Sequence, residues 1–117
     1  MKVALVSLNQ SWEDKEANRL KVRNCFQTIA FRNMDLVIFP EMTLTGFTMN
    51  VKEHAEEAEN SATIRFFTDC ACQYGVYIGF GMILKAGIKA ANHFIIVSPE
   101  GEMCADYIKI HPFSYAG

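Results

Sequence analysis

The chain has 117 residues, half of them hydrophobic, and this is enough apolar material to bury the core of one modest domain. Its formal net charge is −2, and no lysine and arginine block is dense enough to neutralise a row of phosphates, so no nucleic-acid partner is expected. The longest apolar run, residues 76–84, falls well short of the roughly 18 residues of a membrane-spanning helix. We therefore expect no membrane partner, and no export signal is recognised at the start of the chain.

The first third of the chain has the pattern of a strand, a helix and a second strand. Residues 2–8 predict a buried strand, and the Ser-x-x-acid sequence at 11–14 predicts the start of a helix that runs to about Asn33. Apolar residues then recur at helical spacing: Val22, Cys25, Phe26 and Ile29. Residues 35–40 form a short apolar run ended by proline, which is typical of a strand covered on both faces. These three elements predict a β-α-β unit with a parallel pair of strands.

The rest of the chain predicts a loop, a helix and three strands. No period holds over residues 41–60, and the acidic stretch 53–59 favours a solvated loop or short helix over an ion site. A helix begins near Ser61 and ends at Gly75, with an apolar stripe formed by Ile64, Phe67, Ala71 and Tyr74. Strands are predicted at 76–84, 93–98 and 103–111, joined by turns at 85–87 and 99–101 into two antiparallel hairpins. Nothing marks a domain boundary within residues 1–117.

Four cysteines are present, at positions 25, 70, 72 and 104. A hydrophobic chain with no signal peptide points to a reducing compartment, so we expect free thiols and a cytoplasmic protein. On a helix the side chains of Cys70 and Cys72 lie about 200° apart, so both could not ligate one metal ion. The three histidines share no ligand spacing either, and we expect no metal or other cofactor.

Glu41 is the first candidate for chemistry. It follows directly on a buried strand, at the carboxyl end where α/β proteins place ligands. A carboxylate held there would be partly desolvated and a usable proton acceptor. The alternative is a glutamate that caps the following loop, and position alone does not separate the two.

Lys109 is the second candidate. It lies between two isoleucines in the last predicted strand, so its ammonium projects from the opposite face of that strand. Such a lysine lies either at a solvent-facing edge, the commoner arrangement, or in a pocket where its charge stabilises an oxyanion. Gly79-Phe80-Gly81 lacks the third glycine of a dinucleotide fingerprint, so we interpret these glycines as close strand packing.

Two sequence segments carry a resemblance to a known family. Phe39-Pro40-Glu41-Met42-Thr43-Leu44-Thr45-Gly46-Phe47 and Tyr107-Ile108-Lys109-Ile110-His111-Pro112-Phe113 resemble, in order, two of the three signature segments of the nitrilase superfamily of carbon-nitrogen hydrolases. The order of predicted elements also resembles the N-terminal half of that family. Within the superfamily, the sequence around Thr45-Gly46 and the ending 113–117 are most similar to the omega-amidase group.

The resemblance implies an α/β fold, the N-terminal half of an α-β-β-α sandwich in the order β-α-β-loop-α-β-β-β, as an incomplete domain over residues 1–117. It implies that Glu41 is a general base and Lys109 an oxyanion stabiliser in a Glu-Lys-Cys triad that hydrolyses a small amide. The family's nucleophilic cysteine follows the lysine, so none of the four cysteines present is assigned that role. We accordingly expect the native protein to extend well past Gly117, and the chain alone to be inactive.

Several readings of the function stay open. The chain could belong to another branch of the superfamily, nitrilase or N-carbamoyl amidohydrolase, or to an inactive relative that binds carboxylates or amides, or it could be a structural fragment. Glu41 and Lys109 separate none of these. Because half the sandwich is missing, we expect sheet edges and apolar faces to be uncovered and the chain to form homo-oligomers.

Overall fold

The computed structural model describes residues 1–28, 33–46, 48, 51–87, 89–109 and 113–114. In chain order the elements are β1 (Val3–Leu5), α1 (Lys15–Phe26), β2 (Leu36–Ile38), α2 (Val51–His54), the 3-10 helix η2 (Ala58–Asn60), α3 (Ala62–Tyr74), β3 (Tyr77–Ala86), β4 (Lys89–Val97), β5 (Met103–Ile108) and β6 (Phe113–Ser114). This confirms the predicted α/β class and element order, with α2, η2 and β6 as additions.

The strands of the described residues form one mixed sheet in the order β1-β2-β3-β4-β5. The pairs β1–β2 and β2–β3 are parallel, whereas β3–β4 and β4–β5 are antiparallel, as the predicted β-α-β unit and the two predicted hairpins require. The short strand β6 also pairs with β4, beside Lys89 and Ala90. Because β1 and β2 are parallel, their carboxyl ends lie at the same end of the sheet, which is where Glu41 follows β2.

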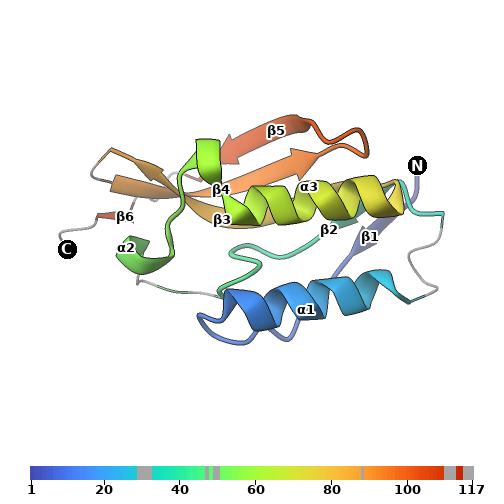
Figure 1. Cartoon of the computed structure of the whole chain (residues 1–117), viewed down its shortest axis with the longest axis horizontal. Coiled ribbons are helices and arrows are strands. Elements are labelled where there is room, and N and C mark those ends of the chain that lie inside the picture. Colours follow the sequence, from blue (N-terminus) through green and yellow to red (C-terminus); the bar gives the residue numbers. More distant parts are fainter. Residues whose placement is uncertain (29–32, 47, 49–50, 88, 110–112, 115–117) are drawn as a thin grey trace.

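Helices α1 and α3 run side by side over one face of the sheet (Figure 1). The core lies between them and contains stacked aromatic side chains: the Phe67 ring of α3 lies 4.2 Å from that of Phe80 in β3, and Phe26 of α1 lies 4.7 Å from Tyr74. Each such contact adds roughly 1 kcal/mol to the burial of the rings themselves. The core therefore fastens both helices to the sheet.

The structure confirms the predicted caps of α3 but not the predicted start of α1. Ser61 caps α3 by accepting from the Ile64 N–H, and Gly75 ends it at φ 65°, which confirms both predictions. Ser11 was wrong as the start of α1, because Asp14 is the cap there and accepts from the Ala17 N–H. The Ser11 hydroxyl is occupied instead by the Lys21 ammonium at 2.9 Å. Helix α1 ends at Phe26, and residues 29–32 of the longer predicted helix lie outside the described part.

The boundaries of several strands differ from the predictions. Strand β1 covers three residues of the predicted 2–8. Strand β4 begins at Lys89, four residues earlier than predicted, because small and polar residues there continue the ladder opposite the end of β3. Strand β5 ends at Ile108, and the predicted continuation to position 111 lies beyond the residues described. Strand length here follows from pairing with a neighbour and not from local preference.

The face of the sheet that the helices do not cover carries exposed apolar side chains. They are Val3 and Leu5 of β1, Tyr77 of β3 and Tyr107 of β5. Leu36 and Ile38 of β2 are only half-buried, so the prediction that this strand is covered on both faces is wrong for the described residues. No helix in the described part is long and apolar enough to span a bilayer.

Candidate functional site

Glu41 lies in a tight turn directly after β2. Met42 beside it has a φ of 46°, a conformation that non-glycine residues adopt rarely, so the turn must be held by its surroundings. The Thr43 N–H donates to the Gly81 carbonyl at 3.0 Å, and the Gly81 N–H donates to the Thr43 hydroxyl at 3.1 Å. This pair of hydrogen bonds fastens the turn to β3.

Gly81 allows this approach because it has no side chain. A Cβ at that position would lie 2.6 Å from the Glu41 Cα and from the Met42 nitrogen, closer than van der Waals contact permits. At Gly79 a Cβ would collide with the Phe94 ring at 2.7 Å. The prediction of close packing at these glycines is therefore confirmed.

Gln10 holds the other side of the turn. Its side-chain amide donates to the Met42 carbonyl at 2.8 Å and the Thr43 carbonyl at 3.0 Å, and it lies 3.5 Å from the Glu41 carbonyl. The position of the Glu41 backbone thus depends on the loop after β1 and on β3 together. Sequence reasoning missed Gln10 and Thr43, since nothing in the local pattern links a glutamine to a turn more than thirty residues later.

Lys109 follows β5 directly, and its N–H donates to the Asn92 carbonyl of β4 at 2.8 Å. Its ammonium donates to Glu41 Oε1, so the fold joins the two predicted site residues across 68 positions of sequence. The two side chains are 54% and 56% exposed. The expected desolvation of Glu41 is therefore not provided by the described residues.

A cavity of about 150 Å³ surrounds this ion pair. Its lining comprises Glu41, Asn92, His93, Phe94, Tyr107, Ile108 and Lys109. The cavity opens on the uncovered face of the sheet, and its lining combines a carboxylate, an ammonium group, an imidazole and two aromatic rings. This arrangement suits a small polar ligand.

None of the four cysteines lines the cavity, and all four are free thiols. Cys70 lies on the buried face of α3, where burial raises the pKa of its thiol to about 11, and burial also raises the pKa of Cys25. A thiolate is the reactive form of cysteine, so both groups are inert at neutral pH. Cys72 on α3 and Cys104 on β5 are exposed.

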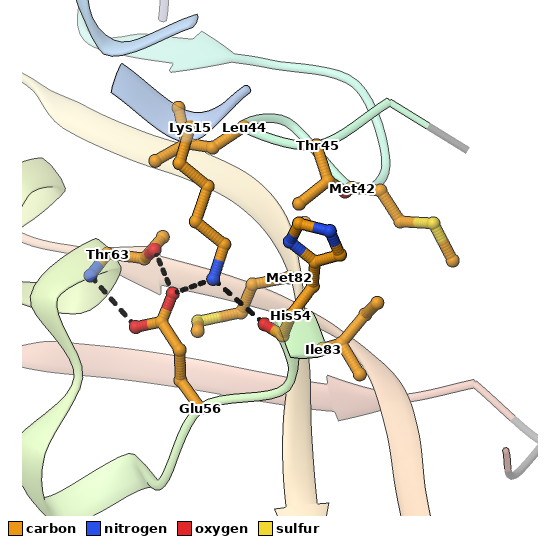
Figure 2. A pocket seen from close by; sticks show the side chains of 10 residues that line it. Lys15, Met42, Leu44, Thr45, His54, Glu56, Thr63, Met82 and Ile83 are labelled. Carbon is orange, nitrogen blue, oxygen red and sulfur yellow. Dashed lines mark hydrogen bonds and ion pairs between the residues drawn. The ribbon is translucent and has the colours of Figure 1, made fainter. Parts of the chain in front are cut away.

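A second polar cluster lies behind the Glu41 turn, in a region predicted to be solvated. Glu56 is half-buried, and the Lys15 ammonium of α1 lies 2.7 Å from its Oε2 and 2.8 Å from the His54 carbonyl oxygen (Figure 2). Met42 and Met82 line the same small cavity, of about 10 Å³. The prediction of a solvated acidic stretch is thus wrong at Glu56, although its acidic neighbours 57 and 59 are exposed.

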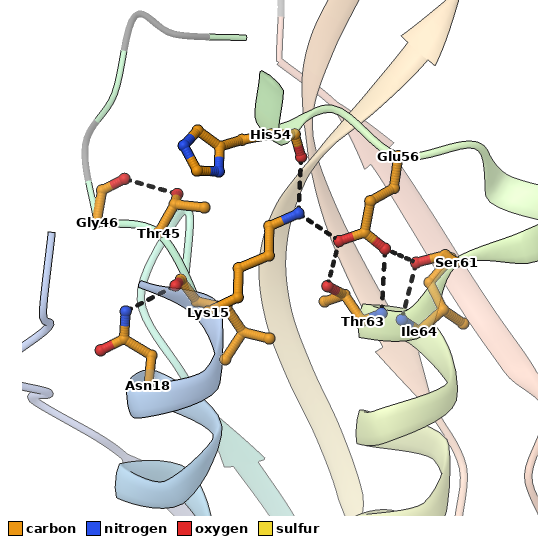
Figure 3. A network of polar contacts seen from close by, with 10 residues as sticks. Lys15, Asn18, Thr45, Gly46, His54, Glu56, Ser61, Thr63 and Ile64 are labelled. Atoms are coloured by element: carbon orange, nitrogen blue, oxygen red, sulfur yellow. Dashed lines mark hydrogen bonds and ion pairs between the residues drawn. The ribbon is translucent and has the colours of Figure 1, made fainter. Parts of the chain in front are cut away.

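Glu56 is the centre of this cluster (Figure 3). Its carboxylate accepts from the Ser61 hydroxyl at 2.6 Å, and from both the N–H and the hydroxyl of Thr63. Burial by itself would raise the pKa of Glu56, but the hydrogen bonds from Lys15, Ser61 and Thr63 outweigh it and lower that pKa to about 2. The carboxylate therefore ties the start of α1 to the start of α3. In the described part, no three acidic, cysteine or histidine side chains gather as a metal site would require.

Comparison with known proteins gives a consistent result. Residues 2–117 match the family described as carbon-nitrogen hydrolase. A nitrilase of Pyrococcus abyssi and the omega-amidase YafV of Yersinia enterocolitica are each 30% identical to the chain over 117 residues. These alignments cover 97% and 100% of this chain but 44% of each relative, so the chain spans less than half the length of the curated relatives it matches.

Solved structures agree on the fold. XC1258 of Xanthomonas campestris, a CN-hydrolase superfamily protein solved with an arsenic adduct in its active site, superposes with a TM-score of 0.82 at 26% identity. The match covers 93% of this chain and 40% of that one. Nit3 of Saccharomyces cerevisiae, a nitrilase superfamily member, matches at a TM-score of 0.78 and 23% identity, over 95% of this chain and 44% of its own. The chain thus has the fold of part of these proteins.

Proposed function

The chain belongs to the carbon-nitrogen hydrolase family, and from this we propose that it supplies the general base and the oxyanion stabiliser of an enzyme that hydrolyses a small amide. The observation that carries the proposal is the contact between the Lys109 ammonium and the Glu41 carboxylate in a cavity of ligand size. Two such groups brought together from distant positions match the needs of acyl transfer, which requires a proton acceptor and a fixed cation.

The proposed nucleophile is a cysteine thiolate from outside these 117 residues. Glu41 takes the thiol proton, the thiolate attacks the amide carbonyl, and Lys109 stabilises the resulting oxyanion. The tetrahedral intermediate collapses as Glu41 returns the proton to the nitrogen, so that ammonia leaves and a thioester remains. Water activated by Glu41 then hydrolyses the thioester to the carboxylate and restores the thiol.

The proposed substrate class is the monoamide of a small dicarboxylic acid. The support is the similarity to the omega-amidase of Yersinia enterocolitica and the aromatic, half-open cavity beside Lys109. The equal similarity to a nitrilase makes nitrile hydrolysis the second candidate. The four free cysteines fit a reducing setting, and we propose the cytoplasm as the compartment.

The test is ammonia release from glutaramate or succinamate by a protein that joins these residues to the proposed cysteine. Glu41→Gln keeps the shape but removes the proton acceptor and should lower kcat about 10²- to 10⁴-fold. Lys109→Met should lower it by a similar factor. Matched controls are Glu57→Gln and Lys85→Met, whose side chains are exposed and lie outside the cavity.

The 117-residue chain alone should release ammonia no faster than buffer, because neither Glu41 nor Lys109 replaces the thiolate that forms the covalent intermediate. If Glu41→Gln or Lys109→Met left kcat of the longer protein unchanged, the substituted residue would have no role in the mechanism. Ammonia release by the chain alone, abolished by Glu41→Gln, would show that the nucleophile lies within it. Binding of the amides without any turnover by the longer protein would favour the reading of an inactive relative.

A further inference from the structure

Asn92 carries an unsatisfied acceptor in the candidate site. The residue is 7% exposed, and its Oδ1 is buried with no hydrogen-bond partner in the described part of the chain. It is the single buried side-chain oxygen or nitrogen in that part for which this holds. A buried polar atom without a partner destabilises the fold, so such atoms are uncommon unless a ligand or water completes them.

The position of Asn92 links this acceptor to the catalytic pair. The register that pairs His93 with Ile108 continues one step and places Asn92 opposite Lys109, as the hydrogen bond from the Lys109 N–H to the Asn92 carbonyl shows. Residues opposite each other in an antiparallel pair project to the same face. Asn92 accordingly lines the same cavity as Lys109 and Glu41.

Among the described residues, no side chain around Asn92 donates a hydrogen bond to its Oδ1. The Lys109 ammonium donates to Glu41, and the neighbouring wall of the cavity is formed by the rings of Phe94 and Tyr107. Glu41 and Lys109 are each about half exposed, so a ligand that binds between them occupies the cavity that Asn92 also lines. The missing partner must be a donor, since Oδ1 can only accept.

We infer that Asn92 Oδ1 accepts a hydrogen bond from the N–H of the scissile amide and so makes the site selective for amides. The inference rests on the proposed function. A primary amide offers a carbonyl oxygen and two N–H groups: the oxygen faces the Lys109 ammonium, and the two N–H groups face Glu41 and Asn92. The matching ester has the same carbonyl and no N–H, and a nitrile has neither. A site built to bond an N–H discriminates against analogues that lack it, because its buried acceptor is then left unpaired.

The experiment compares kcat/KM for glutaramate and for monomethyl glutarate, in the same longer protein used to test the proposed function. Asn92→Leu has a similar shape and no acceptor, and it should lower the amide-to-ester ratio of kcat/KM about 10-fold or more while ester turnover persists. Asn92→Asp keeps an acceptor at the same point and should retain the ratio, even where its charge lowers both rates. Asn24→Leu makes the same change at an exposed site on α1 and should alter nothing.

The amide-to-ester ratio of kcat/KM distinguishes a role of Asn92 in selectivity from a purely structural role. If Asn92 only supported the fold or held Lys109, Asn92→Leu would lower both rates by the same factor, and the inference would be overturned. If the well-folded Asn92→Asp variant had a lowered amide-to-ester ratio of kcat/KM, the inference would be overturned as well. Wild-type protein that hydrolyses neither compound would refute the proposed function itself, and this inference with it.

Discussion

At the scale of single residues, the candidate site depends on one absent side chain. Gly81 of β3 lets the backbone of the Glu41 turn approach to within 2.6 Å of the place where a Cβ would stand. The clash would be with backbone atoms, which have no rotamer to escape into. The carboxylate of Glu41 is consequently aimed by a strand to which it is not adjacent in sequence.

We expect Gly81→Ala to displace the Glu41 turn. In the longer protein that joins these residues to the proposed cysteine, it should lower kcat for amide hydrolysis by at least about 10²-fold, because a misplacement near 1 Å is enough to disrupt a reacting geometry. The measurement is kcat together with the melting temperature. Gly87→Ala is the matched control: nothing lies within 4 Å of its Cβ, so its φ of +64° costs some stability and leaves kcat unchanged. Equal kcat in the two variants would contradict the role of Gly81.

At the scale of elements, the Lys15–Glu56 cluster decides how α1 and α3 meet the sheet. The Glu56 N–H donates to the Ile83 carbonyl at 3.0 Å, and the Lys85 N–H donates to the Glu56 carbonyl at 2.8 Å, so the backbone of Glu56 bonds to β3. Its side chain at the same time reaches Lys15 at the start of α1 and Ser61 at the start of α3. A single residue thereby joins three elements.

The lowered pKa of Glu56 predicts how stability depends on pH. The pKa falls from its ordinary 4.5 to about 2 on folding, which corresponds to a stabilisation of about 3 kcal/mol. Since the folded pKa is the lower one, this stabilisation is fully present above about pH 4.5 and is lost as the pH falls through about 2. Glu56→Gln should therefore be less stable than the wild type at pH 6, and the difference should shrink as the pH is lowered across this range.

Denaturant melts of both proteins at several pH values measure this difference in the free energy of unfolding. Glu57→Gln, a neutral substitution at the exposed neighbouring position, serves as the control and should match the wild type throughout. If the difference in the free energy of unfolding between Glu56→Gln and the wild type stayed constant down to pH 2, the stabilisation would not come from the lowered pKa of Glu56.

At the scale of the whole molecule, one face of the sheet is covered by helices and the other carries exposed apolar side chains. Leu5 of β1 is 79% exposed and Tyr107 of β5 is 64% exposed. Exposed apolar side chains gathered on one face of a sheet commonly mark an interface. We propose that, in the isolated 117-residue chain, a second copy covers this face.

We expect the 117-residue chain to form dimers or larger assemblies, and Leu5→Lys to shift it toward the monomer, because the substitution places a charge within the apolar face. Light scattering across a dilution series measures the effect. Leu20→Lys introduces the same charge at a 61% exposed position on α1, away from that face, and should leave association unchanged. A monomeric wild-type chain at high concentration would show that the face needs no partner.

The sequence by itself determined the features that depend on neighbouring residues. Helix α3 with its caps at Ser61 and Gly75 follows from local hydrogen bonds and periodicity, and so does the order of strands and helices. The segments around Glu41 and Lys109 were found by their resemblance to a family, and their contact required the folded chain.

Tertiary structure alone decided the features that depend on distant partners. Asp14 caps α1 while the Ser11 hydroxyl accepts from Lys21. Glu56 is half-buried because Lys15 offers a charge to pair with it, and Asn92 acquires its place in the site because β4 and β5 pair in one register. Gln10 belongs to the Glu41 turn for the same reason. Hydrogen bonds between groups far apart in sequence leave no periodic trace, so no local pattern can predict them.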